Sequence, residues 1–183
     1  MKYIYGMVNL SELHLRKLPD FLKDIDVIEG TFVCHDNKLT SLENCPRIIK
    51  DIFSCRVNYL TSLIGGPTEA RVYMCHMNQL KSLEGAPEIN EAGFYCAHNP
   101  LVSLIGAPRI VKDAFLTSFC KLKTLEGSPR VIGQNFDCSH NDLTSLKGAP
   151  EEVGGDFDCR FNKVKFKYSD VANVCNVKGR ILV

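Results

Sequence analysis

Cysteine, histidine and aspartate are the residues of this 183-residue chain best suited to chemistry, and all three recur at regular spacing. Six of the nine cysteines fall in one repeating position, roughly 21 residues apart: Cys34, Cys55, Cys75, Cys96, Cys138 and Cys159. A metal centre needs four ligands that converge on a point. Residues at one position of successive strands instead form a line with a rise of about 4.8 Å. We therefore expect the thiols to act as small buried hydrophobes.

The other three cysteines leave an odd total, so a complete disulfide framework is not favoured. Cys45 and Cys175 lie outside the repeating position, and we expect them to be the more reactive thiols. So many unpaired thiols are typical of a reducing compartment. We therefore expect a cytoplasmic protein.

The histidines and aspartates give two further chemical hypotheses. His35, His76, His98 and His140 are spread over several repeats, which does not favour a shared metal site. Asp137 and Asp158 are one repeat apart and should face each other at about 5 Å, the separation found in retaining glycosidases. An open sheet has no pocket that excludes water from a sugar, so a solvated or partner-facing acidic patch is favoured. We expect no catalytic set, no metal and no cofactor.

These residues belong to a repeated phrase, Phe-x-Cys-x-x-Asn-x-Leu-x-x-Leu with a proline four residues later, which is clearest over residues 136–150. A fixed period of about 21 residues indicates a stack of small units that contact mainly their neighbours. One unit departs from the phrase, because Thr117 replaces the cysteine and Cys120 replaces the asparagine. A thiol is a weaker hydrogen-bond donor than an amide, so this turn should be held less firmly.

The phrase resembles the leucine-rich repeat signature L-x-L-x-x-N-x-L, with Phe and Cys in the first two apolar positions. The resemblance covers roughly residues 8–166, and the S-L-x-G-x-P tail is similar to the short repeats of bacterial and phage proteins, including type III effectors. It implies an α/β-type leucine-rich-repeat solenoid that is mostly β. A parallel sheet would form the concave face, and the convex side would be extended or polyproline-like with little helix.

The repeated asparagines are Asn37, Asn58, Asn78, Asn99, Asn141 and Asn162. They stand where the chain leaves each predicted strand, and a carboxamide offers two donors and an acceptor to buried main-chain groups. We expect a ladder in which each asparagine satisfies its own turn and a neighbouring one.

Composition and charge bound the organisation of the chain. We expect one solenoid over residues 1–183, with an N-terminal cap and divergent first repeat at 1–31, repeats at 32–163 and a C-terminal cap at 164–183. The 22 Lys and Arg residues nearly balance the 21 Asp and Glu residues, for a net charge of +1. This balance gives no general attraction to nucleic acid or to anionic membranes, so we expect neither as a partner. We also find no apolar run that could span a membrane and no leader-like segment.

Strand parity identifies the side chains on the concave face. They are the residues just before and just after each repeated cysteine and the residue three before it. From these we predict a partner-binding surface made of Val33, His35, Arg56, Val72, Met74, His76, Tyr95, Leu116, Asp137, Asp156, Asp158 and Arg160. Its centre is apolar and its far end is acidic, with Arg160 partly neutralising the carboxylates. Exposed apolar patches rich in Tyr and Met are typical of protein interfaces.

The sequence therefore predicts a non-enzymatic module that binds a protein with an apolar anchor and a basic flank. Its resemblance to phage and bacterial repeat proteins suggests an inhibitor of a host defence or regulatory protein, located in the host cytoplasm if a phage encodes it. The alternative is a structural or scaffold component that self-associates, whereas a capture module should be a monomer or a small oligomer. A ubiquitin-ligase effector is disfavoured, because only about 17 residues follow Phe166 and such a domain needs a long helical segment.

Overall fold

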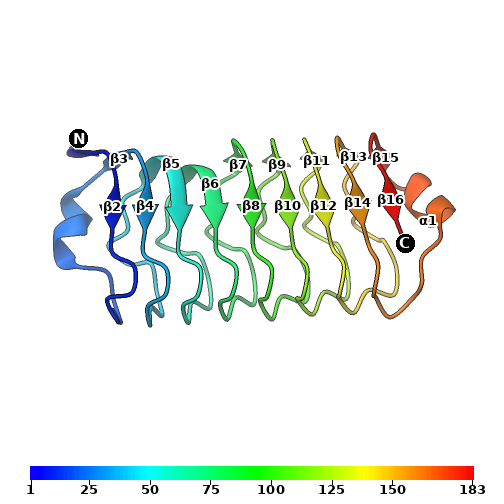
Figure 1. The fold of residues 1–183 in the computed structure, drawn as a ribbon, viewed down its shortest axis with the longest axis horizontal. Coiled ribbons are helices and arrows are strands. Elements are labelled where there is room, and N and C mark those ends of the chain that lie inside the picture. The colour runs from blue at the N-terminus through cyan, green and yellow to red at the C-terminus, as the bar shows by residue number, and fades with distance from the viewer.

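A computed structural model describes all 183 residues and shows a parallel β solenoid whose coils stack along one axis (Figure 1). The strands of the first half are β1 (Tyr3–Tyr5), β2 (Val8–Asn9), β3 (Val27–Glu29), β4 (Phe32–Val33), β5 (Ile48–Ser54), β6 (Glu69–Met74), β7 (Ile89–Asn90) and β8 (Phe94–Tyr95). Those of the second half are β9 (Ile110–Val111), β10 (Phe115–Leu116), β11 (Val131–Ile132), β12 (Phe136–Asp137), β13 (Glu152–Val153), β14 (Phe157–Asp158), β15 (Asn176–Val177) and β16 (Ile181–Leu182). The only helices are the 3-10 helix η1 (Asp20–Asp24) and α1 (Tyr168–Ala172).

Two parallel sheets follow the axis of the solenoid. The main sheet has 11 strands in the order β1-β3-β5-β6-β8-β10-β12-β14-β16, with β4 pairing β2 and β5. The second sheet has five strands in the order β15-β13-β11-β9-β7, and it lies along the edge where each coil enters the main sheet (Figure 1). The predicted mostly-β solenoid with a parallel sheet and little helix is confirmed. The second sheet is a difference from the prediction, because part of each return segment pairs instead of staying irregular.

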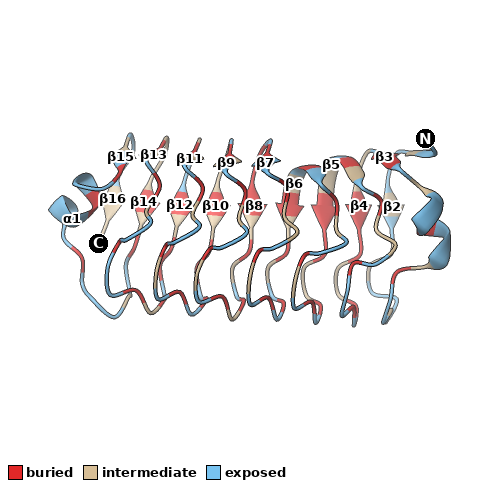
Figure 2. Ribbon diagram, turned by 180° about the vertical axis from the view of Figure 1, so that it is seen from behind, coloured by how far each residue is buried: buried red, intermediate tan, exposed pale blue.

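The core is a column of aromatic rings beside a column of thiols. Phe32, Phe53, Tyr73 and Phe94 begin the aromatic column, and successive rings lie 5.0–5.9 Å apart along its length. All of these rings are fully buried, and the leucines that close each coil from the other side are buried too. Figure 2 colours buried residues red, and red stretches occur on most main strands and on the return path of the coils. Because side chains two apart on a strand share a face, the Phe-x-Cys pattern places both residues in this interior.

Buried asparagines connect the coils where the strands end. The amide of Asn78 donates to the carbonyl oxygens of Cys55 (3.0 Å) and Cys75 (3.1 Å), and its Oδ1 accepts the Leu60 N–H (3.0 Å). Each regular asparagine therefore bonds its own coil and the preceding one. The predicted ladder is present, and it satisfies main-chain groups that would otherwise be buried without partners.

The irregular coil at Cys120 lacks part of this ladder. The Cys120 thiol lies 3.6 Å from the Cys96 carbonyl oxygen and 3.8 Å from that of Ser118. In the other coils the equivalent leucine N–H donates to a carboxamide oxygen, whereas the Leu101 N–H faces the Cys120 sulfur, a weaker acceptor. This turn is therefore held by weaker hydrogen bonds than its neighbours.

Ion pairs link neighbouring coils along the second sheet and the return segments. Lys50 pairs with Glu69 at 2.7 Å and Lys112 with Glu91 at 2.6 Å, and similar pairs recur further along the axis. At the C-terminal end α1 packs on the last coil, with Val171 buried beneath it. No helix of the protein is long and apolar enough to cross a bilayer.

Candidate functional site

The outward side chains on the main strands and at their ends form one surface, which we call the sheet face, and a single row of residues runs along its middle. Residues one coil apart are direct partners in the parallel register, so the predicted neighbours are brought together. The row comprises Val33, Ser54, Met74, Tyr95, Leu116, Asp137 and Asp158. Met74, Tyr95 and Leu116 are partly exposed at its centre, with Val72 two residues before Met74 on the same strand.

Tyr95 lies back along its own strand. A side chain at Gly93 would collide with the Tyr95 hydroxyl, so the absence of one there makes room for the ring. Partial burial raises the pKa of the Tyr95 hydroxyl, and the nearby charge of Asp113 adds to this effect. The ring therefore presents a broad, flat apolar surface between Met74 and Leu116.

The N-terminal part of the sheet face carries imidazole and guanidinium groups. His35 Nδ1 lies 2.7 Å from Asp36 Oδ2, and Arg56 Nη2 lies 3.6 Å from the same oxygen. Burial lowers the pKa of His76, and the charge of Arg56 lowers it further. His35 and Arg56 thus share a single carboxylate, and His76 follows on the next coil.

The carboxylates at the other end of the face are largely neutralised. Arg160 binds Asp158 through two hydrogen bonds, Nε to Oδ1 at 3.0 Å and Nη2 to Oδ2 at 2.7 Å. Arg180 of the C-terminal cap binds Asp156 at 2.7 Å and lowers the pKa of its carboxyl group by hydrogen bonding. Asp137 has no cationic partner and accepts only the Ser139 N–H, at 2.9 Å. The acidic zone therefore offers one uncompensated carboxylate instead of three.

Val33 and the cysteines differ from the other predicted residues because most of them are buried. Val33 is only 8 % exposed, so it adds little to an accessible surface. The column cysteines are buried as predicted, and all nine cysteines are free. Cys175 is buried with its pKa raised to about 11, and burial raises the pKa of Cys45 well above its usual value. Cys45 is partly exposed. The raised pKa values nevertheless do not favour the higher reactivity that we expected of these two thiols, since reactivity requires the thiolate.

A second row of side chains escaped the sequence analysis. The residue two after each repeated cysteine, and two after Thr117 in the irregular coil, has a left-handed backbone. Its φ lies between 52° and 57° in every coil from Asp36 to Phe161. Four of these residues stack in sequence: His98 on Phe119 at 4.7 Å, Phe119 on His140 at 4.3 Å and His140 on Phe161 at 4.4 Å. We call this group the ring ladder. Continuing the parity analysis one residue past the strand would have shown its recurrent aromatic and imidazole side chains.

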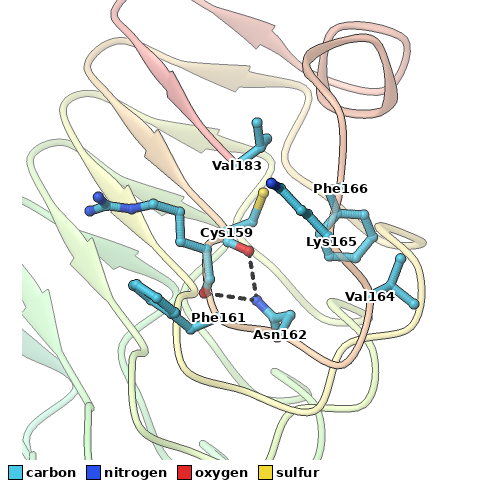
Figure 3. Close-up of a pocket in the computed structure, with 8 residues that line it drawn as sticks. Cys159, Phe161, Asn162, Val164, Lys165, Phe166 and Val183 are labelled. Atoms are coloured by element: carbon cyan, nitrogen blue, oxygen red, sulfur yellow. Dashed lines mark hydrogen bonds between the residues drawn. The ribbon is translucent and has the colours of Figure 1, made fainter.

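A pocket of about 370 Å³ lies at the C-terminal end of the solenoid (Figure 3). It is lined by Cys159, Arg160, Phe161, Asn162, Val164, Lys165, Phe166 and Val183. Burial raises the pKa of the Cys159 thiol to about 12, so the thiol is protonated near neutral pH. The lining includes no histidine or carboxylate side chain that could act as a base, and this pocket therefore has no nucleophile–base pair.

Comparison with protein-family models gives no match, and a search of curated proteins finds no similar sequence.

Proposed function

We propose that this protein is a non-enzymatic binding module that holds a partner protein on its sheet face. The observation that carries this proposal is the alignment of Met74, Tyr95 and Leu116 on three adjacent strands, in register and partly exposed. Tyr and Met are enriched at the centres of protein interfaces. A sheet tied by buried asparagines is already ordered before binding, which lowers the entropy cost of association.

The charged side chains around this apolar centre indicate which charged groups a partner would carry. An apolar anchor would lie on Tyr95, and a carboxylate of the partner would meet Arg56 and His76 at one end. At the other end only Asp137 remains to attract a cation, so the basic flank expected from the sequence reduces to one contact. The resemblance of the repeats to those of bacterial and phage proteins supports an inhibitor that occludes a host defence or regulatory protein, which needs no chemistry.

The test compares what the wild-type chain and the double variant Tyr95→Asp/Leu116→Asp retain from a bacterial lysate, using mass spectrometry. A matched control, Ile64→Asp/Ile105→Asp, changes two apolar side chains that are 58 % and 59 % exposed on the return segments. We expect a protein retained by the wild type and the control but lost with the sheet-face variant. Identical captures by all three would place the interface elsewhere.

A self-associating structural component is the second candidate, and the ends of the main sheet favour it. β1 and β16 each pair with a single strand, and Tyr3 and Tyr5 on β1 are exposed. Unpaired strand edges can add a strand from another molecule. Light scattering across a range of concentrations distinguishes the candidates, because end-to-end association gives a mass that grows with concentration.

A further inference from the structure

The charges of this protein are unevenly distributed around its coils. We call the three rows of side chains where the coils leave the main sheet the turn edge. They are the left-handed residues and the residues one and three positions after each ladder asparagine, with Cys120 taking the place of the asparagine in its coil. In every coil these positions belong to the segment that follows the main strand. Figure 1 shows these segments side by side along the axis of the solenoid. With the equivalent positions of the first coil, they hold seven cations and three carboxylates on a chain of net charge +1.

The cations of the turn edge are mostly without partners. Six of the seven are exposed and have no carboxylate within ion-pair distance, whereas Lys163 pairs with Asp142 at 3.4 Å. The six are Arg16, Lys38, Lys81, Lys121, Lys123 and Lys165. The return segments and second sheet differ, because there Lys50, Arg71, Lys112 and Arg130 all pair with a carboxylate of a neighbouring coil.

Apolar side chains stand between these cations. Phe119 is 50 % exposed and Phe161 is 66 % exposed, and Met77 and Tyr59 on earlier coils are exposed to a similar degree. The coils are spaced by about 4.8 Å, so the cations extend over roughly 30 Å of a straight edge. Between the first coils the edge contains a depression of about 270 Å³ lined by Arg16, Lys38, Thr40 and Tyr59.

The ring ladder indicates which polyanion fits this edge. Single-stranded nucleic acid binds aromatic side chains by stacking bases on their faces. Phe119 has both faces covered, by His98 at 4.7 Å and by His140 at 4.3 Å, so it presents only its edge. Ring edges and aliphatic side chains between lysines instead suit an anionic lipid surface, where lysines meet headgroup charges and apolar groups enter the boundary with the acyl chains.

We propose that the turn edge docks this protein on membranes that contain anionic lipids. Lys121 and Lys123 supply charge beside Phe119 on one coil, and Lys165 does so beside Phe161 on the last. We expected no membrane partner because the net charge is only +1. That total sums the positive charge of the turn edge with the paired charges of the other faces, so it does not reveal a local excess of cations. Docking through the turn edge uses none of the side chains of the sheet face, so the inference is independent of the proposed protein-binding function.

The test measures cosedimentation of the full chain with vesicles of phosphatidylcholine, with and without phosphatidylserine. We expect binding only to vesicles with phosphatidylserine, weakening as salt rises. Lys121→Gln/Lys123→Gln should lower the affinity by about 30-fold, taking about 1 kcal/mol per lysine near an anionic surface. Lys112→Gln/Arg130→Gln removes the same charge from ion-paired positions and should bind like the wild type.

A third variant separates the apolar contribution from the charge. Phe119→Asn removes the ring and places at φ 54° a residue that tolerates this backbone conformation, so the fold should be retained. It should weaken vesicle binding by about tenfold, as expected for loss of a partly buried aromatic ring, without changing the salt dependence.

Three results would overturn the proposal. The first is wild-type binding to phosphatidylserine vesicles no stronger than to phosphatidylcholine. The second is an equal loss in the Lys121/Lys123 and Lys112/Arg130 variants, which would attribute binding to net charge alone. The third is binding to single-stranded DNA or polyglutamate with no binding to vesicles, which would make the turn edge a site for soluble polyanions.

Discussion

Replacing Asn78 by alanine tests whether the asparagine ladder holds the coils together. Asn78 is 3 % exposed, and its carboxamide joins two coils through three short hydrogen bonds. The substitution removes all three and leaves the aromatic and thiol columns in place. It therefore measures the ladder separately from the apolar core.

The size of the loss in the free energy of unfolding depends on which main-chain groups are left without any hydrogen bond. The Cys55 carbonyl oxygen keeps the Asn58 amide at 3.1 Å, and the Cys75 carbonyl oxygen keeps the Asn99 amide at 3.1 Å. The Leu60 N–H has only the Asn78 oxygen and becomes a buried donor without an acceptor. An unsatisfied buried donor costs about 1–3 kcal/mol, and each lost hydrogen bond adds about 1 kcal/mol or less. We expect a total loss of about 2–4 kcal/mol.

Urea unfolding followed by circular dichroism measures this change in the free energy of unfolding. The native spectrum should be unchanged and the midpoint should move to lower urea, with a similar slope. Gln79→Ala is the matched control, because Gln79 is exposed and its backbone N–H bond to the Leu60 carbonyl oxygen (2.9 Å) remains. A loss below about 0.5 kcal/mol for Asn78→Ala would refute the reasoning, since such a value is typical of an exposed site without a structural role.

Three further predictions concern single side chains. Cys120→Asn should stabilise the protein by about 1–2 kcal/mol, because it gives the Leu101 N–H a carboxamide oxygen in place of a weakly accepting sulfur; an unchanged urea midpoint would contradict this. Tyr73→Phe should raise the melting temperature, because the Tyr73 hydroxyl is buried with no hydrogen-bond partner; a lower melting temperature would show that the hydroxyl is needed for packing. The pKa of His76 is lowered by burial and then by Arg56, so the folded state binds a proton less readily than the unfolded chain. Stability should therefore fall as the pH drops below the ordinary value of 6.5, and His76→Gln should reduce that fall in thermal melts; parallel curves would contradict it.

Residue spacing was enough to predict the register of the main sheet. Phe136 and Cys138 share a strand face, and a period of about 21 residues places the next pair directly beside them. The adjacency of Tyr95 and Leu116 follows from the same argument. The asparagine ladder was also predictable, because a buried turn must satisfy its main-chain groups.

Features that depend on side-chain direction or on non-repeating segments were not predictable in this way. The Asp156–Arg180 ion pair joins a repeat to the C-terminal cap, whose sequence has no period to align it. The flattened Tyr95 ring depends on the missing side chain at Gly93, a local substitution in the pattern. The second sheet needs only two residues per coil, such as Ile110 and Val111, too few for an alternating pattern to be recognised.

The residues with a left-handed backbone show that the stability of the fold does not by itself explain which side chain occupies a position. Each turn requires φ near 55° just before its asparagine, a conformation that costs a bulky L-residue about 1–2 kcal/mol and that asparagine or glycine adopts more easily. Phe119 and Phe161 occupy it nonetheless, and stacking on His140 returns about 0.5–1.5 kcal/mol per pair. The backbone cost and the stacking gain nearly cancel, so stability alone does not explain why phenylalanine occupies these positions. Contact of the ring edges with a lipid surface would explain it. On that proposal, Phe119→Asn should change vesicle binding far more than the free energy of unfolding.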